Sequence, residues 1–267
     1  MLTVSGLYIY PIKGCRGISL SEAVVEDIGL ADDRRLLVID DDGTFLSQRE
    51  VATIALIDVR VHPSGWQLSA PHVPSIVVTP TTTGPTRLAT IWRDTCMVVD
   101  QGDAIARWLS SVLGQTCRLV VMAPSYRRLV SADYALKADD AVSFADGYAS
   151  LITNSRSLED LNSKLSIPIG MDRFRPNIVV SGAPAWDEDE WHEIRIGDVE
   201  VTAVKPCARC VVTTTDQMNG SRSHEPLATL TTFRKFGHGV IFGQNLIHRT
   251  HGMIRVGDTV KITRRRS

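Results

Sequence analysis

What this 267-residue sequence lacks excludes several classes of protein. No apolar run reaches the roughly 20 residues that cross a bilayer, and residues 1–11 lack the basic and apolar segments of a secretory signal peptide. The formal net charge of -1 and the pI near 6.7 show no basic excess, so neither nucleic acid nor a membrane surface is expected as a partner. Five cysteines, an odd number, argue against a secreted disulfide framework. We therefore expect a cytoplasmic protein in a reducing compartment.

Common catalytic signatures are also missing. The sequence holds no GxSxG nucleophile elbow, no Walker A loop and no GxGxxG dinucleotide fingerprint. Its seven histidines show no HExxH spacing, which would indicate a zinc protease. The acidic run at residues 187–190 (DEDE) is typical of a solvated loop rather than of a paired-carboxylate site.

The most informative feature that is present is a pair of cysteines, Cys207 and Cys210, in the segment KPCARC (205–210). The other three cysteines stand singly at positions 15, 96 and 117, so a four-thiolate zinc site is not expected. The β-branched run VVTTT (211–215) predicts a strand after Cys210, whereas thioredoxin-like motifs open a helix. The pattern indicates a thiolate beside Arg209 at the edge of a β-structure, which suits a soft metal or an anionic cofactor.

Three further clusters place cations or hydroxyl groups beside turns. In PIKGCRG (11–17), glycines would let a phosphate approach the backbone next to Lys13, although a solvated turn is the alternative. In FRPN (174–177), an arginine between an aromatic residue and a proline has few rotamers and suits bidentate contact, but a surface arginine at a strand entry fits equally well. The segment TNS (153–155) could bind an anion at a helix start, and a plain N-cap is its commoner explanation.

Strand signals dominate the rest of the chain. Alternating residues predict strands at 4–10, 35–39, 54–62 and 97–100, and helical spacing predicts helices at 103–113, 157–165 and 226–236. Two similar hairpin corners, at 195–200 and 255–260, suit a closed barrel better than an open sheet. We predict a mainly β (α+β) fold with a few helices, in which a β-rich N-terminal domain (1–123) precedes a β-barrel domain (124–267).

Taken in order, these segments resemble the MOSC-domain proteins. The closer resemblance is to their two-domain members, the mitochondrial amidoxime-reducing components and the bacterial N-hydroxy-compound reductases, and it runs nearly the whole length. It implies a MOSC N-terminal domain followed by a MOSC β-barrel. The segments that carry it are YPIKGCRG (10–17), DR (33–34), LSQR (46–49), LITNSRSLEDLN (151–162), RFRPNIVVSG (173–182), CARC (207–210), the stretch 226–234, IFGQ (241–244) and IRVGDTV (254–260).

The resemblance implies a molybdenum pyranopterin cofactor (Mo-molybdopterin) whose metal is bound by Cys210. A thiolate is a strong ligand for molybdenum, and the adjacent Arg209 would favour the thiolate form. Cys207 and Cys15 would be structural thiols, and pyridoxal phosphate is not expected. The cofactor-binding residues that the resemblance implies are Lys13, Gly14, Arg34, Thr153, Asn154, Ser155, Arg175, Asn177, Ala208, Arg209 and Cys210.

The implied activity is that of an oxidoreductase that reduces the N–O bond of small hydroxylamines, amidoximes and N-oxides. Asp216 is a candidate proton donor, and a turn aspartate before Asn219-Gly220 explains it equally well. No cysteine follows Cys210, so a fused iron–sulfur domain is not expected. Electrons would then come from a separate protein, such as a ferredoxin, a cytochrome b5-like protein or a flavin reductase.

Two other functions remain open at this point. Cys210 could carry sulfur, or the chain could bind and deliver the molybdenum cofactor without using it. A metal-free dithiol oxidoreductase that uses Cys207 and Cys210 is the third reading.

Overall fold

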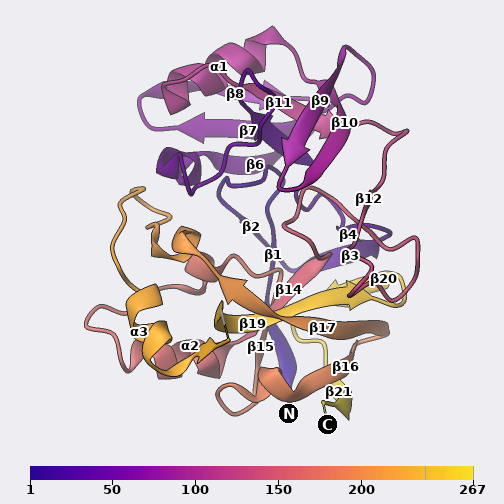
Figure 1. Ribbon diagram of the computed structural model, residues 1–267, viewed down its shortest axis with the longest axis vertical. Helices are drawn as coiled ribbons and strands as arrows, with labels where there is room; N and C mark the ends of the chain where they lie inside the picture. The colour runs from indigo at the N-terminus through magenta and orange to yellow at the C-terminus, as the bar shows by residue number, and fades with distance from the viewer. Residues whose placement is uncertain (238, 267) are drawn as a thin grey trace.

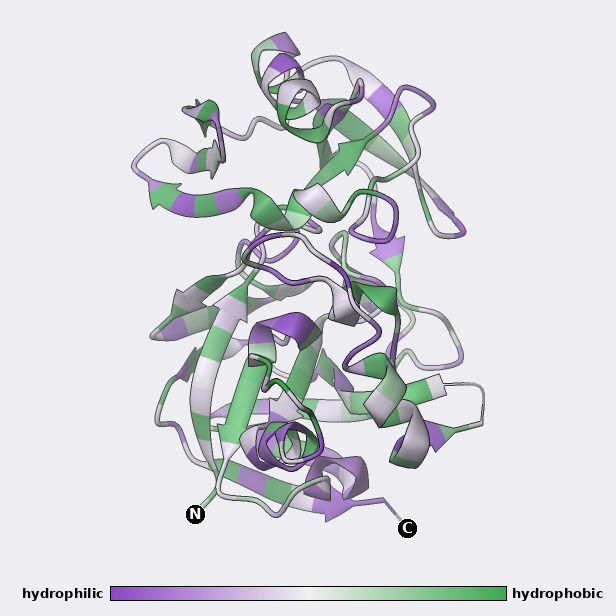
Figure 2. Cartoon of the chain, turned by 90° about the vertical axis from the view of Figure 1, so that its left-hand side faces the viewer, coloured by the Kyte–Doolittle hydropathy of each residue, from purple (hydrophilic) through white to green (hydrophobic). Residues whose placement is uncertain are grey.

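Strands build most of the protein and are gathered into two lobes stacked along its long axis (Figure 1). The computed structural model describes residues 1–237 and 239–266. Both chain ends lie at the far end of the C-terminal lobe in two perpendicular views (Figures 1 and 2). None of the described helices has the length and apolar character that a membrane crossing needs. The predicted class, mainly β with a few helices, is confirmed.

The N-terminal lobe consists of two antiparallel sheets and one long helix. Its four-stranded sheet has the order β5-β11-β10-β9, and its three-stranded sheet has the order β6-β7-β8. Its elements are β5 (Leu36–Ile39), the 3-10 turn η1 (Ala52–Leu56), β6 (Asp58–His62), β7 (Gly65–Ala70), β8 (Val73–Val78), β9 (Thr86–Ile91), β10 (Asp94–Asp100), α1 (Asp103–Leu113) and β11 (Arg118–Met122).

The C-terminal lobe is built on a nine-stranded sheet in the order β2-β1-β15-β14-β19-β17-β16-β21, with β18 paired to β19. Two small sheets, β20-β3-β4 and β12-β13, lie beside it. Its elements are β1 (Thr3–Ile9), β2 (Ile18–Leu20), β3 (Glu22–Glu26), β4 (Gly29–Leu30), β12 (Arg128–Leu129), β13 (Ala141–Val142), β14 (Ser150–Asn154), α2 (Ser155–Asn162), η2 (Met171–Phe174), β15 (Ile178–Ser181), η3 (Asp187–Glu190), β16 (Trp191–Ile196), β17 (Val199–Arg209), η4 (Val211–Thr214), α3 (Leu227–Phe233), β18 (Lys235–Phe236), β19 (Gly239–His248), β20 (Gly252–Arg255) and β21 (Val260–Arg265).

The first strands of the chain belong to the C-terminal lobe. β1 pairs antiparallel with β15, and its start is hydrogen-bonded to the residues that lead into β21, with Val4 N donating to Asp258 O at 2.9 Å and Val260 N to Leu2 O at 2.9 Å. These bonds bring the two ends of the sheet together, and such closure removes exposed strand edges. The lobes therefore do not follow a single cut in the sequence, and the division at residues 123 and 124 stays a prediction.

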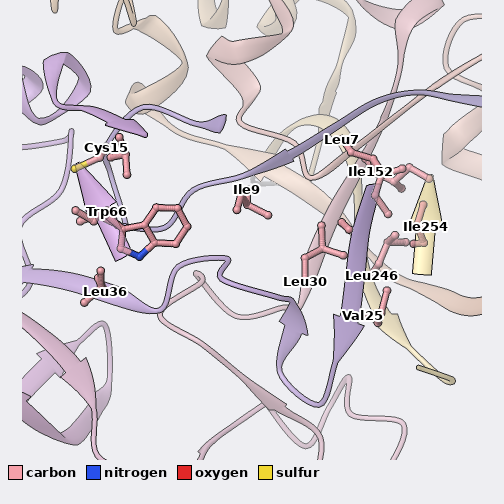
Figure 3. Close-up of a cluster of buried hydrophobic side chains, with 14 of the residues drawn as sticks. Leu7, Ile9, Cys15, Val25, Leu30, Leu36, Trp66, Ile152, Leu246 and Ile254 are labelled. Atoms are coloured by element: carbon pink, nitrogen blue, oxygen red, sulfur yellow. The ribbon is translucent and has the colours of Figure 1, made fainter. Parts of the chain in front are cut away.

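One hydrophobic core runs through both lobes. The largest cluster of buried side chains includes Leu36 and Trp66 from the N-terminal lobe and Ile152, Leu246 and Ile254 from the C-terminal lobe (Figure 3). Hydropathy coloring shows the apolar residues concentrated on the strands of both lobes (Figure 2). Because the core is continuous, the lobes hold each other in place and can share a site.

The helices form close to where their sequence patterns predict them. α1 occupies exactly the predicted residues, and Gly114, with φ of 71°, ends it. α2 begins two residues early because Asn154 is its N-cap and accepts a hydrogen bond from Arg156 N at 3.1 Å. α3 is shorter than predicted, and residues 235–236 pair as β18 instead.

Three local predictions are wrong. The first part of the strand expected at 54–62 belongs to the 3-10 turn η1, and β6 begins only at Asp58. The residues after Cys210 form the 3-10 turn η4 rather than a strand, because Thr213 Oγ1 donates back to Cys210 O at 3.0 Å and Thr214 Oγ1 to Val211 O at 2.7 Å. The strand is β17, which ends at Arg209. The acidic run forms η3 rather than a solvated loop, and the side chain of Glu188 within it is fully buried.

Candidate cofactor pocket

A pocket of about 150 Å³, partly open to solvent, lies where the two lobes meet. Its C-terminal side includes the turn after β1, the turn between η2 and β15, the end of β17 and the start of η4. Eight of the residues that the sequence predicted for a cofactor line it: Lys13, Gly14, Arg34, Arg175, Asn177, Ala208, Arg209 and Cys210.

The two partly exposed thiols of the chain both face this pocket. Cys207 lies near the end of β17, and Cys210 immediately follows that strand. Arg209 Nη1 donates to Cys207 Sγ at 2.9 Å, so the guanidinium contacts the first thiol and not the second, where the sequence placed its effect. Cys15, by contrast, is fully buried, and burial raises the pKa of its thiol to about 12. It is therefore a neutral, structural thiol.

Two arginines are fixed against the ring of Tyr10. The guanidinium carbons of Arg34 and Arg175 lie 4.5 and 4.2 Å from the ring centroid. Arg34 Nη1 donates to Asp33 Oδ2 at 2.5 Å and to Asn177 Oδ1 at 3.1 Å, whereas Arg175 Nη1 donates to the carbonyl of Cys15 at 2.7 Å. Asn177 thus acts as a support for Arg34 rather than as a free ligand.

Backbone strain is concentrated around the pocket. Six non-glycine residues of the described chain have a positive φ, and three of them, Arg34 (51°), Trp92 (57°) and Arg175 (53°), line the pocket. Such conformations cost about 1–3 kcal/mol each and persist where the surroundings hold them. Gly14, with φ of 89°, takes the conformation at less cost.

Lys13 and Asp146 form an ion pair on the pocket wall. The Lys13 side chain is only 9% exposed. The Asp146 side chain is 71% exposed, because it faces the open part of the pocket, where water reaches it. Burial lowers the pKa of Lys13, and Asp146 opposes this effect. Burial also disfavours the charged form of Asp146, but Lys13 and Arg34 outweigh it and hold the pKa of this carboxyl well below its usual range.

The lining carries a large excess of positive charge. Lys13, Arg34, Arg49, Arg175 and Arg209 face a single acidic side chain, that of Asp146. Two buried donors, Arg175 Nη2 and Arg209 Nε, have no hydrogen-bond partner among the described residues. Buried donors without partners are costly, so this arrangement fits an anionic ligand. A molybdenum pyranopterin, with its phosphate and its need for a thiolate ligand, has the chemistry that these residues accept.

Four predicted site residues lie outside this pocket. Thr153, Asn154 and Ser155 stand at the junction of β14 and α2, where Asn154 caps the helix and donates from Nδ2 to Pro184 O at 2.6 Å. Asp216 accepts from Met218 N at 2.8 Å and from Arg173 Nη2 at 3.1 Å. These contacts match the alternatives of a plain N-cap and a turn aspartate, and the structure does not bring either group to the thiols.

Several lining residues were not predicted from the sequence as cofactor-binding, although Cys207 was discussed as a thiol. They come from segments far apart in the sequence, and only the tertiary fold brings them together. The turn dipeptide Asp146-Gly147 was a weak signal for one of them; for Trp92 and Asn245 the local sequence offered none. The set is Phe45, Ser47, Gln48, Arg49, Trp92, Ala145, Asp146, Gly147, Tyr148, Ser150, Leu151, Phe174, Cys207, Val212, Thr213 and Asn245.

Two family models match the chain, one after the other. The MOSC N-terminal beta barrel domain matches residues 1–116, and the MOSC domain matches residues 139–261. Together they define a two-domain MOSC protein.

The chain belongs to the family of the amidoxime-reducing components. It is 37% identical to mitochondrial amidoxime-reducing component 1 of Mus musculus, over 97% of this chain and 81% of that protein. The corresponding protein of Homo sapiens is 35% identical, over 97% and 82% of the two chains. Mitochondrial amidoxime reducing component 2 of Rattus norvegicus is 34% identical, with the same two coverages.

Proposed function

We propose that this protein is a molybdenum-cofactor-dependent reductase of small N-hydroxylated compounds, namely hydroxylamines, amidoximes and N-oxides. The observation that carries the proposal is the pocket in which an accessible thiol, Cys210, lies beside the guanidinium groups of Arg175 and Arg209, which pair with no carboxylate of the described residues. The names of the relatives support the substrate class, because they are called amidoxime-reducing components.

Four of the five cations in the pocket would hold the cofactor. The unpartnered Arg175 Nη2 and Arg209 Nε would donate to its anionic and polar groups, with Lys13 and Arg34 adding positive charge at the phosphate. Ala208 has a small side chain and Gly14 has none, so both would leave the backbone within reach of the pterin. Cys210 Sγ would be the protein ligand to the metal.

When bound, the cofactor supplies the two electrons that break the N–O bond, with water as the second product. The chain itself binds the substrate, excludes part of the solvent and sets the charge of the site. Asp146 stays ionised because of Lys13, so it holds the ammonium in place and does not donate a proton. Protons would then enter from solvent through the open mouth. We assign electron supply to a separate donor protein (a ferredoxin, a cytochrome b5-like protein or a flavin reductase) and the whole system to the cytoplasm.

The test is metal and pterin analysis of protein made in a host that synthesises the cofactor, followed by reduction of benzamidoxime with a chemically reduced viologen. We expect near-stoichiometric molybdenum and formation of benzamidine in the wild type. Cys210→Ser should lose both, whereas Cys207→Ser, the matched control on the same strand end, should keep its molybdenum.

Three results would contradict the proposal. Absence of molybdenum and pterin in the wild type would remove the cofactor, and cyanide-labile sulfur on Cys210 would then favour a sulfur carrier. Bound cofactor without turnover of any N-hydroxylated compound would favour a delivery protein. Equal loss of activity in both cysteine variants of a metal-free protein would favour a dithiol oxidoreductase.

A further inference from the structure

The N-terminal lobe closes one side of the pocket with two aromatic rings and an arginine that the cofactor proposal does not use. Trp92 and Phe45 meet edge to face, with ring centroids 4.8 Å apart and an interplanar angle of 62°. The guanidinium carbon of Arg49 lies 4.3 Å from the centroid of the Trp92 ring. No carboxylate of the described residues pairs with Arg49, so its positive charge is uncompensated at the pocket wall.

Trp92 occupies a turn position that glycine normally takes. It is the first residue of the two-residue turn between β9 and β10, where Ile91 pairs with Asp94. Its φ of 57° is typical of glycine in such turns, and a bulky residue there costs about 1–3 kcal/mol. The side chain is also 38% exposed, so burial recovers only part of this cost. Fold stability alone gives no reason for a tryptophan here.

The ring of Trp92 is nevertheless held in one orientation. Trp92 Nε1 donates to Asp146 Oδ1 at 3.2 Å, across the junction between the lobes. Phe45, in an edge-to-face contact, and the guanidinium of Arg49, which lies over the ring, hold it from two further directions. The result is a flat, partly exposed aromatic surface beside a free cation, and both line the same pocket as Cys210.

We propose that Trp92 and Arg49 form the subsite for the part of the substrate that does not react. This subsite selects N-hydroxylated compounds whose reacting group is attached to a planar aromatic ring, and it favours rings that carry a carboxylate. An aromatic ring gains about 0.5–1.5 kcal/mol from an offset or edge contact with another ring beyond the burial of its area. Arg49 adds a charge-assisted hydrogen bond to a carboxylate on the ring, a group that benzamidoxime and acetamidoxime lack. The inference rests on the proposed function and names the substrate class within it.

The experiment compares three compounds with the same reacting group: benzamidoxime, 4-carboxybenzamidoxime and the ringless acetamidoxime. Cofactor-loaded wild type is measured beside Trp92→Gly, Trp92→Phe and Arg49→Gln, with reduced viologen as electron donor. Glycine removes the ring and adopts the turn conformation without strain, so loss of the fold is not expected from this variant. Leu88→Ala is the control, because Leu88 is 62% exposed on the same hairpin and lies outside the pocket.

Trp92→Gly should raise KM for benzamidoxime by about 5-fold and change kcat/KM for acetamidoxime by less than about 2-fold. Trp92→Phe should recover most of the loss. Arg49→Gln should raise KM only for the carboxylated compound, by about 10-fold. Molybdenum content and the values for Leu88→Ala should stay at the wild-type level.

Titration calorimetry with the same three compounds provides a second readout that needs no turnover. A preference in binding for benzamidoxime over acetamidoxime, abolished by Trp92→Gly, would support the subsite. It would do so even if the wild type reduced neither compound, because that lack of reduction would overturn the proposed function alone. Equal effects of Trp92→Gly on benzamidoxime and acetamidoxime in both assays, or no effect on either compound, would overturn the subsite. Loss of molybdenum from Trp92→Gly would also overturn it, because the residue would then support the cofactor.

Discussion

Replacing Glu188 by glutamine should stabilise the protein above neutral pH and change its stability little in mild acid. The Glu188 side chain is fully buried in η3. Its Oε2 accepts hydrogen bonds from Ser157 Oγ at 2.8 Å and from Asn154 Nδ2 at 3.2 Å, and its Oε1 has no partner among the described residues. Burial therefore raises the pKa of the carboxyl to about 7, although the two hydrogen bonds oppose the rise.

The sign of the pH effect follows from proton binding. Between the unfolded pKa of 4.5 and the folded pKa of about 7, the folded protein binds more protons at Glu188 than the unfolded chain does. The free energy of unfolding therefore falls as the pH rises through this window and changes no further above it. A pKa difference of this size corresponds to roughly 3 kcal/mol. Glutamine has nearly the same shape, keeps an acceptor for Ser157 and Asn154, and carries no charge at any pH.

The assay is urea unfolding of the wild type and of Glu188→Gln at intervals from pH 4.5 to pH 8, with tryptophan fluorescence as the signal of unfolding. The quantity to plot is the difference in unfolding free energy between the two proteins, because every other titration cancels in it. This difference should shift in favour of glutamine by roughly 3 kcal/mol from the acidic to the alkaline end. Glu190→Gln is the control, since Glu190 lies exposed in the same turn and its difference should stay flat. A flat difference for Glu188→Gln would refute the reasoning.

Two further substitutions test the fold. Asp100 is buried and accepts from Arg118 Nη2 at 2.9 Å, so Asp100→Asn should cost about 1–3 kcal/mol in chemical denaturation at pH 7. Burial opposes ionisation of Asp100, but Arg118 outweighs it and lowers the pKa of the carboxyl. The stabilisation by the Asp100 carboxylate is therefore lost as the pH falls below about 4. A destabilisation by Asp100→Asn that stayed the same in acid would contradict this role of the ion pair. Gly243→Ala should lower the melting temperature clearly more than Gly114→Ala, although both glycines have a positive φ. A Cβ at Gly243 would lie 2.7 Å from Ile152 O, whereas none of the described atoms lies within 4 Å of a Cβ at Gly114. Equal shifts in melting temperature would show that the close contact at Gly243 relaxes.

Local patterns in the sequence predicted local structure well. The apolar face of α1 and the glycine that ends it depend on neighbours within a few residues, so the boundaries of this helix are confirmed. The run after Cys210 misled because its β-branched residues favour strands while its hydroxyl groups bond back to the preceding turn. The acidic run misled for a different reason: its burial depends on Ser157 and Asn154, which are distant in the sequence.

The candidate site shows the same division. Segments that carry chemistry of their own, such as KPCARC and FRPN, contain residues that do line the pocket, and their role in binding the cofactor stays a prediction. TNS looked equally suitable because an N-cap and an anion site have the same residue types. Trp92, Arg49 and Asp146 come together only through the pairing of the lobes, so no local pattern could have assembled them.

The path of the chain makes the N-terminal lobe an insertion in the C-terminal one. The chain begins in the C-terminal sheet, leaves it at β5 and returns from β11, and these two strands are direct neighbours, with Leu36 opposite Val121. A segment whose entry and exit lie side by side can be exchanged for another with little change to the host fold. The wall of the pocket that carries Trp92 and Arg49 could thus be replaced as one cassette, and substrate preference could diverge among relatives without disturbing the thiols.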